Sequence, residues 1–124
     1  MDGEALLVAD RFFRAVEDGD TDEVARIYAF DARIWHNFSQ REQSVEENLK
    51  VLRWMARKLP GRRYDVLRRV AIPGGFMQQH VVRGALADGT AFAMPACVIC
   101  LVEDGHIVRL EEYLDPAQAA VLSA

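Results

Sequence analysis

Hydrophobic residues recur at helical spacing in the first half of the chain and at strand spacing in the second half. A first helix is predicted over residues 4–18, and Gly19 ends it. Asp20 and Ser44 are each followed three residues later by a glutamate, a capping pattern that predicts a short helix from Asp20 and a longer helix from Ser44 to Pro60. The apolar positions of the three helices are Ala5, Val8, Phe12 and Val16, then Val24, Ile27 and Tyr28, then Val45, Leu49, Leu52, Met55, Ala56 and Leu59.

Long runs rich in β-branched residues follow Gly61, and they span 62–72, 76–87, 90–102 and 106–114. The pairs Asp88-Gly89 and Asp104-Gly105 separate the last three runs, and an Asp-Gly pair between alternating strands is typical of a β-hairpin. A shorter strand is predicted over 32–37, and a short helix is predicted to begin at Asp115-Pro116. Pro95 cannot donate a hydrogen bond to a neighbouring strand, so we expect a bulge there that helps the sheet to curl.

The predicted order of elements is α-α-β-α-β-β-β-β with a short C-terminal helix. One domain spanning 1–124 is expected, because a chain of this length supports one core and no linker or repeat interrupts it. The fold class is α+β, in which helices cover a strongly curved antiparallel sheet. The strand over 90–102 has apolar residues on both faces, so we expect a homodimer that packs sheet on sheet.

The composition is that of an ordinary globular protein, with 51% hydrophobic and 27% charged residues. The net charge of −4 and the lack of a basic stripe argue against nucleic acid as a partner. The N-terminus has no basic region typical of a secretory signal, and the longest apolar run, 91–102, is much shorter than the ~20 residues of a membrane helix. We therefore expect a cytoplasmic protein that does not bind membranes.

Cys97 and Cys100 have a spacing that occurs in redox and metal motifs, but they lie in a predicted strand. Side chains alternate between the faces of a strand, so residues three apart point in opposite directions. Two separate core cysteines are expected. The three histidines, His36, His80 and His106, lack the H-x-H or H-x-x-x-H spacing of metal ligands, so neither a metal nor a cofactor is expected.

Three segments of the sequence resemble the nuclear transport factor 2 superfamily, which includes ketosteroid isomerases, SnoaL-like polyketide cyclases and limonene-epoxide hydrolases. The segments are residues 12–20 ending in Gly19-Asp20, the corner Tyr28-Ala29-Phe30-Asp31-Ala32, and the meander that ends in Glu112-Tyr113-Leu114-Asp115. The resemblance implies a cone-shaped, cystatin-like α+β barrel around a pocket for a small apolar molecule. It leaves the function open, because this fold serves enzymes, binding modules and dimerisation domains.

The resemblance also implies candidate site residues. The catalytic groups of the ketosteroid isomerases fall near His36, Phe12 and Val98, so two of their three roles are lost. The run Trp35-His36-Asn37 is similar to the aromatic-x-Asn motif with which epoxide hydrolases orient water. Glu112 takes the position of their base, and Gln78 and His80 take the positions of their Arg and Asp.

The alternation of faces selects acid–base candidates without reference to the family. Glu112 is the one carboxylate on the apolar face of the strand over 106–114, which makes it a plausible base or acid near neutrality. The structural alternatives are an acid at the exposed end of the strand and an acid paired with Arg83 or Arg109. His80 shares a face with apolar residues of the strand over 76–87, where it is either an acid–base group or a hydrogen-bonded core residue.

His36 and Asn37 point to opposite faces because they are adjacent in a strand. The isomerase-like alignment places His36 inside the cone, and the hydrolase-like alignment places Trp35 and Asn37 inside, so both alternatives stay open. Other residues expected to line a pocket, or alternatively to belong to the core, are Tyr28, Trp54, Gln78 and Met94.

Three hypotheses for function follow from these residues. The first is a cofactor-independent acid–base enzyme of isomerase, cyclase or dehydratase type, in which Glu112 and one histidine exchange protons with a small hydrophobic substrate. The second is an epoxide hydrolase in which Glu112 activates a water held by Asn37 and His80 protonates the opening oxygen. The third is a non-catalytic domain for ligand binding or dimerisation.

Overall fold

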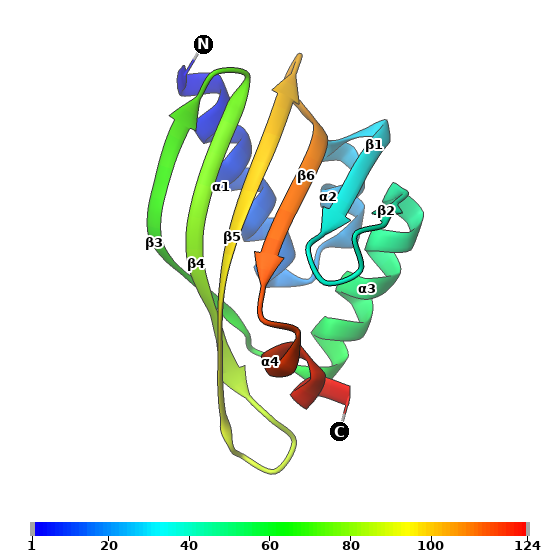
Figure 1. Ribbon diagram of the computed structural model, residues 1–124, viewed down its shortest axis with the longest axis vertical. Helices are drawn as coiled ribbons and strands as arrows, with labels where there is room; N and C mark the ends of the chain where they lie inside the picture. Colours follow the sequence, from blue (N-terminus) through cyan, green and yellow to red (C-terminus); the bar gives the residue numbers. More distant parts are fainter. Residues whose placement is uncertain (1, 124) are drawn as a thin grey trace.

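The computed structural model describes residues 2–123, which form four α-helices, one 3₁₀ helix and a six-stranded sheet (Figure 1). The elements in chain order are α1 (Asp2–Asp18), α2 (Thr21–Ile27), β1 (Tyr28–His36), β2 (Glu42–Gln43), α3 (Val45–Lys58), β3 (Arg63–Ile72), β4 (Gly75–Ala85), β5 (Ala91–Glu103), β6 (His106–Leu114), α4 (Pro116–Ala120) and η1 (Val121–Ser123). The α+β class and the order of the main elements agree with the sequence prediction.

The strand order in the sheet is β2-β1-β6-β5-β4-β3, and the sheet curls without closing (Figure 1). Four of its strand pairs are antiparallel, but β1 runs parallel to β6. The sheet is therefore mixed, whereas an antiparallel sheet was predicted. A tight turn forces two strands to be antiparallel, but a helix and four strands separate β1 from β6, so no turn determines their relative direction. The two-residue β2 was not predicted because it is too short to produce a periodic pattern.

The predicted hairpins are present. Asp104 and Gly105 both adopt the left-handed backbone conformation, with φ of 51° and 77°, which matches the twist of a two-residue turn to the twist of β5 and β6. The bulge predicted at Pro95 is wrong. Pro95 pairs in register with Val81 of β4, and the pairing of β5 with β6 begins only at Ala96, so no β6 residue pairs with Pro95. The register shifts within these four strands lie between Val66 and Arg68 and between Leu101 and Val102.

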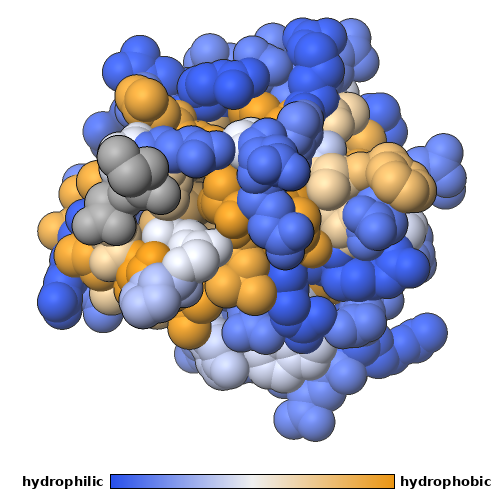
Figure 2. All heavy atoms as spheres, turned by 90° about the horizontal axis from the view of Figure 1, so that it is seen from above, coloured by the Kyte–Doolittle hydropathy of each residue, from blue (hydrophilic) through white to orange (hydrophobic). Residues whose placement is uncertain are grey.

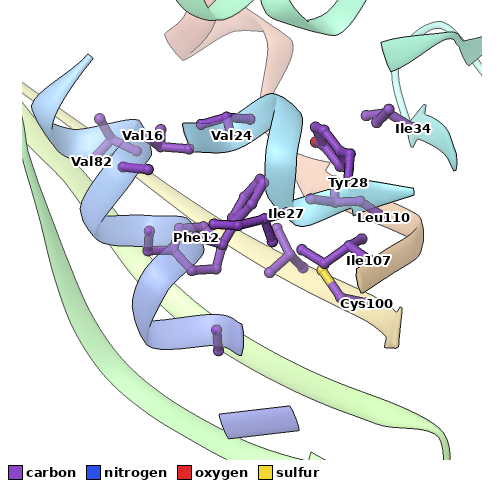
Figure 3. Packing of buried hydrophobic residues seen from close by; sticks show 14 of the residues in the cluster. Phe12, Val16, Val24, Ile27, Tyr28, Ile34, Val82, Cys100, Ile107 and Leu110 are labelled. Atoms are coloured by element: carbon purple, nitrogen blue, oxygen red, sulfur yellow. The ribbon is translucent and has the colours of Figure 1, made fainter. Parts of the chain in front are cut away.

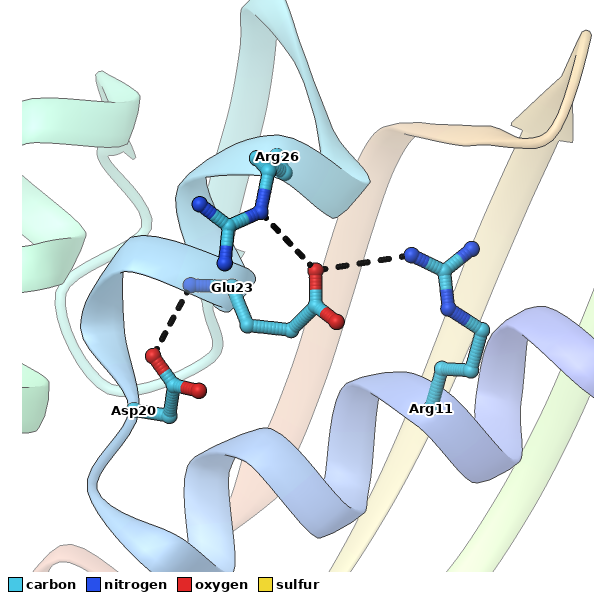
Figure 4. A network of polar contacts seen from close by, with 4 residues as sticks. All are labelled: Arg11, Asp20, Glu23 and Arg26. Carbon is cyan, nitrogen blue, oxygen red and sulfur yellow. Dashed lines mark hydrogen bonds and ion pairs between the residues drawn. The ribbon is translucent and has the colours of Figure 1, made fainter.

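The two predicted capping boxes differ. At Ser44 both reciprocal hydrogen bonds with Glu47 are formed. At Asp20 only half of the box is formed, because Asp20 accepts a hydrogen bond from the backbone of Glu23 while the Glu23 carboxylate binds Arg11 and Arg26 instead (Figure 4). This exposed ion-pair cluster joins α1 to α2 next to the corner that leads into β1.

The helices α1, α2 and α3 lie on one face of the sheet, and the hydrophobic core fills the space between them and the strands (Figure 1, Figure 3). Phe12 of α1, Ile27 of α2 and Cys100 of β5 are among the buried residues that meet there. Seen from the end that carries the N-terminus, the surface is mostly hydrophilic with hydrophobic patches between the polar side chains (Figure 2). Within residues 2–123, no helix has the length and apolar character needed to cross a membrane.

Candidate functional site

Two adjoining chambers lie between the helices and the inner, concave face of the sheet, and they share five lining residues. The shared residues are His36, Asn48, Leu52, Tyr64 and Glu112. The inner chamber has a volume of about 40 Å³ and is otherwise lined by core residues such as Phe12, Tyr28 and Val98. The outer chamber has a volume of about 160 Å³, and Trp54, Met94 and Leu122 contribute to its mostly apolar wall. We refer to the two chambers together as the cavity.

His36 and Glu112 meet where the two chambers adjoin. They are register partners on the parallel strands β1 and β6, so both side chains project from the same face of the sheet. His36 Nε2 lies 3.0 Å from Glu112 Oε1, and the two side chains are 9% and 19% exposed. The imidazole N–H donates to the carboxylate oxygen at this distance. Because His36 occupies Oε1, the second carboxylate oxygen, Oε2, is left for a ligand.

The arginines that could have neutralised Glu112 are bound elsewhere. Arg83 pairs with Asp65 across β3 and β4, and Arg109 pairs with Glu42 and Glu111 on the outer face. The predicted alternative of an arginine–Glu112 pair is therefore wrong. Glu112 has a histidine as its partner in a cavity whose wall is mostly apolar.

Tyrosine and asparagine side chains add hydrogen-bonding groups to the cavity. The Tyr28 hydroxyl donates to Asn48 Oδ1 at 2.9 Å in a buried hydrogen bond. Burial is the main cause that raises the pKa of both Tyr28 and Tyr64, and the negative charge of Glu112 contributes, so both phenols keep their protons at neutral pH. A partly buried, protonated Tyr64 that lines both chambers is a hydrogen-bond donor for a ligand.

Tyr64 and Asn48 were missed in the sequence analysis, and a local signal existed only for Asn48. Asn48 lies one turn from Val45 and from Leu52, on the apolar stripe of α3, and a polar residue in such a stripe points toward the core. Tyr64 is the second residue of β3, a strand whose irregular register, shifted between Val66 and Arg68, obscures the alternation of faces.

His80 and Gln78 lie side by side on the inner face of β4, and both are fully buried at 1% and 0% exposure. Neither is among the residues that line the chambers. The His80 ring instead contacts the rings of Phe13 and Tyr64, at centroid distances of 5.3 and 4.9 Å, and those two rings line the inner chamber. Burial lowers the pKa of His80, and the Arg69 charge contributes, while Glu112 opposes the shift. His80 is therefore a neutral imidazole directly behind the cavity wall.

Trp35 and Asn37 do not line the chambers. The ring of Trp35 packs against Tyr113 at a centroid distance of 5.3 Å. The Asn37 amide donates to the backbone oxygen of Leu114 at 3.1 Å and accepts from its backbone nitrogen at 3.0 Å. Asn37 thus extends the ladder between β1 and β6. Of the two alternatives left open by the sequence, the structure places His36 inside and Asn37 outside.

The remaining candidates are placed as follows. Tyr28 lines the inner chamber, and Trp54 and Met94 line the outer one. Cys97 is partly exposed and Cys100 is buried, and neither forms a disulfide. Residues 2–123 contain no group of three or more His, Cys, Asp or Glu side chains arranged to hold a metal ion. The groups that the cavity offers are therefore suited to proton transfer and hydrogen bonding.

A larger surface hollow of about 410 Å³ lies between the β4–β5 loop and the end of the chain. Its lining residues are Lys58, Leu86, Ala87, Asp88, Val121 and Leu122. Among the described residues that line it, Lys58 and Asp88 are the ionisable ones, and they include no buried acid–base pair. The cavity beside His36 and Glu112 is therefore the better candidate for a functional site.

Known proteins share this architecture. The sequence model of the SnoaL-like domain matches residues 9–110. Among solved structures, an LEH-like epoxide hydrolase from M. tuberculosis superposes with a TM-score of 0.77 at 18% identity, covering 98% of this chain and 90% of that one. IdmH from Streptomyces antibioticus, a proposed polyketide cyclase, superposes with a TM-score of 0.81 at 19% identity, covering 94% and 95%.

A third similar structure is an NTF2-like protein of unknown function from Burkholderia pseudomallei. It has a TM-score of 0.80 at 16% identity, and the match covers 96% of each chain. No curated protein matches the sequence. At these identities the structural matches show a shared fold and do not assign an activity.

Proposed function

Because this chain belongs to the SnoaL-like domain family, we propose that it is a cofactor-independent acid–base enzyme that acts on a small hydrophobic molecule in the cavity. The family match agrees with the resemblance predicted from the sequence, and the known relatives of this fold support a role in processing small molecules. The observation on which the proposal rests is the His36–Glu112 pair, which lies at the junction of two apolar chambers.

The proposed chemistry is proton transfer at a carbon atom next to a carbonyl group. Glu112 Oε2 takes the proton, so the C–H bond breaks, an O–H bond forms, and the electron pair moves onto the carbonyl oxygen. His36 holds Oε1 and keeps the carboxylate oriented. Tyr64 or Asn48, which line both chambers, donates a hydrogen bond to the negative oxygen.

The fate of that proton distinguishes the reaction types within the proposal. If Glu112 returns it to a different carbon, the product is an isomer. If it protonates a departing hydroxyl, the products are an alkene and water. In an aldol-type cyclisation the carbanion attacks a second carbonyl of the same molecule, and the proton goes to the new alkoxide.

The volume of the cavity favours a ligand with a single ring. An engineered apolar cavity of about 150 Å³ accommodates benzene. The outer chamber of about 160 Å³ and the inner chamber of about 40 Å³ are therefore large enough for a monocyclic molecule. A rigid molecule with several fused rings would require the wall to rearrange.

The proposal is tested with 3-cyclohexen-1-one, a one-ring ketone that becomes 2-cyclohexen-1-one when a proton moves from the carbon beside the carbonyl to the far end of the double bond. Absorbance of the conjugated product reports the rate. Glu112→Gln keeps the shape of the side chain but removes its proton-transfer capacity, and we expect the rate to fall about 100-fold or more. Glu111→Gln is the matched control, because Glu111 is adjacent in β6 and pairs with Arg109 outside the cavity.

The assignment of Glu112 would be overturned if the wild type converts the ketone faster than buffer alone and Glu112→Gln converts it at the same rate. Binding of the ketone without conversion, and without deuterium uptake in D₂O, would favour the non-catalytic binding domain. The epoxide hydrolase hypothesis requires Asn37 to hold the attacking water, but the Asn37 side chain binds the Leu114 backbone outside the cavity. Formation of an ¹⁸O-labelled diol from 1-methylcyclohexene oxide in H₂¹⁸O would revive it and contradict the present proposal.

A further inference from the structure

A row of hydrogen bonds runs from the surface to the buried His80. Arg69 and Gln78 are register partners on β3 and β4, and Arg69 Nε donates to Gln78 Oε1 at 2.6 Å. Gln78 Nε2 lies 2.9 Å from His80 Nδ1. At its outer end, Arg69 is paired with Asp10 of α1 at 3.7 Å. The side chains of Arg69 on β3 and of Gln78 and His80 on β4 therefore form a series of hydrogen bonds that begins at Arg69 and ends at His80.

The direction of this series follows from the chemistry of arginine. A guanidinium group has five N–H donors and no acceptor, so the atom of Gln78 that faces Arg69 must be the carbonyl oxygen. The amide NH₂ then faces His80. This settles an assignment that is otherwise ambiguous, since the oxygen and nitrogen of a glutamine amide differ little in shape.

The amide of Gln78 in turn determines which ring nitrogen of His80 bears hydrogen. Because the NH₂ group donates to Nδ1, that nitrogen must present its lone pair. Burial keeps the ring neutral, since it lowers the pKa of His80, and a neutral imidazole has one N–H. The hydrogen of His80 therefore resides on Nε2.

His80 Nε2 is buried and has no hydrogen-bond partner within the described residues. An unsatisfied buried donor destabilises a fold, so such groups in native proteins call for a missing partner such as a ligand. The surroundings of His80 agree with a ligand as that partner. Its two ring neighbours, Phe13 and Tyr64, line the inner chamber, and Glu112 is close enough to influence its charge.

We infer that Gln78, oriented by Arg69, is a positioning residue that fixes His80 as the Nε2–H tautomer, and that this N–H donates a hydrogen bond to an oxygen atom of a ligand that reaches past the Phe13 and Tyr64 rings from the inner chamber. The ligand class is thereby narrowed to small apolar molecules that bear an uncharged oxygen acceptor, such as a ketone. The second half of the inference rests on the proposed function, whereas the tautomer does not.

The tautomer is measured directly in ¹⁵N-labelled wild-type protein by long-range ¹H–¹⁵N correlation NMR at pH 8, which distinguishes a protonated ring nitrogen from an unprotonated one. We expect His80 to show a protonated Nε2 and an unprotonated Nδ1. A protonated Nδ1 would overturn the inference. This measurement needs neither a substrate nor a variant.

Variants test whether Gln78 sets the tautomer. In Gln78→Glu the carboxylate has only acceptors, so the hydrogen of His80 should move to Nδ1, and the pKa of His80 should rise. Gln79→Glu, which adds the same charge on the exposed face of the same strand, should leave the His80 signals unchanged. If Gln78→Glu fails to fold, Arg69→Leu is the milder change, because it frees the amide to rotate and should produce a mixture of tautomers.

Cyclohexanone and methylcyclohexane serve as probes of the ligand contact. Saturating cyclohexanone should shift the Nε2 and Hε2 signals of His80, and methylcyclohexane, which has no acceptor, should not. Equal shifts with both probes, or none with either, would overturn the ligand contact. Failure of the proposed function is distinguishable, because a protein that turns over no ketone can still show the predicted tautomer and the ketone-dependent shift.

Discussion

Glu111 and Glu112 are adjacent in β6, and they show how differently the two faces of the curled sheet use the same side chain. Glu111 lies on the outer, convex face, where Arg109 Nε donates to it at 2.7 Å in an ion pair that also includes Glu42. Glu112 lies on the inner, concave face, where its partner is His36 and its other neighbours are largely apolar. The alternation of a strand alone separates the two environments.

The contrast extends across the whole sheet. Polar groups on the outer face, such as Arg83 and Asp65, pair with opposite charges in water, where an ion pair contributes little to stability. Polar groups on the inner face are few, and they bind one another in His36–Glu112, Tyr28–Asn48 and Gln78–His80. Function is therefore expected from the inner face, and changes of equal chemistry should have unequal effects on the two faces.

Truncation of an aromatic side chain should show the largest difference between the faces. Phe76 of β4 is completely buried and packs edge-on against Phe13, so Phe76→Ala should lower the free energy of unfolding by about 3–5 kcal/mol. Tyr113 of β6 is 47% exposed on the outer face, and Tyr113→Ala should cost about 1 kcal/mol or less. Urea denaturation measures both values, and equal costs would mean that the outer face is buried in solution.

Loss of the hydrogen bonds between the Asn37 side chain and the Leu114 backbone should have the next largest effect on stability. Asn37→Ala removes two hydrogen bonds to the Leu114 backbone, and we expect it to cost about 1–3 kcal/mol of stability. Asn37→Asp keeps the acceptor and loses the donor, so its free energy of unfolding should lie between those of the wild type and Asn37→Ala. Turnover per folded molecule should be unchanged in Asn37→Ala. A large loss of turnover in a stable variant would instead return Asn37 to the water-orienting role predicted from the sequence.

The sequence was sufficient for the fold class and for most elements, because capping residues, Asp-Gly turns and alternating strands are local signals. It failed where the outcome depends on contacts between distant segments. The direction of β1 relative to β6 is set by a strand far away in the chain, and the half-formed capping box at Asp20 depends on Arg11 and Arg26, which both bind the Glu23 carboxylate. Pro95 could be placed only once the pairing of β5 with β6 was known to begin at Ala96.

The candidate site was predictable only in part, because some of its residues follow from local alternation and others from contacts between distant segments. Alternation placed Glu112 and His80 on the inner face, but it could not choose between His36 and Asn37 before the start and register of β1 were known. Tyr64 was hidden by the register shift in β3. The homodimer predicted from the apolar outer face stays a prediction. Leu101 and Tyr113 are exposed there at 39% and 47%, and sedimentation of the chain tests it.

A buried histidine on the inner face of the sheet and an exposed histidine should contribute differently to the pH dependence of the free energy of unfolding. The pKa of His80 is lowered by burial, so as the pH falls through the unfolded value of about 6.5 the unfolded chain binds a proton that the folded protein does not. The free energy of unfolding therefore decreases between pH 7.5 and 5.5, by up to about 1 kcal/mol from His80. The groups around His80 that affect this titration are Arg69 and Tyr64 on β3 and Glu112 on β6, while α1 contributes the uncharged Phe13.

His80→Gln should remove that part of the pH dependence in urea denaturation series. His106→Gln is the control, because His106 is exposed at the β5–β6 turn, where its ring contacts the Asp104 backbone. An unchanged slope in His80→Gln would mean that His80 binds protons equally in the folded and the unfolded chain. Burial would then not favour the neutral ring, contrary to the argument for the Nε2–H tautomer.

The smallest effect is expected for the ion pair between Arg83 and Asp65 on the outer face. Its atoms are 2.9 Å apart, but both side chains are 42% exposed, so water and salt screen the attraction. A double-mutant cycle with Arg83→Met and Asp65→Asn should give a coupling below about 1 kcal/mol that vanishes in 1 M NaCl. The same cycle with His36→Gln and Glu112→Gln should give a larger coupling that salt reduces less, because those side chains are only 9% and 19% exposed. Equal couplings, with equal dependence on salt, would show that the shelter of the concave face does not strengthen polar contacts.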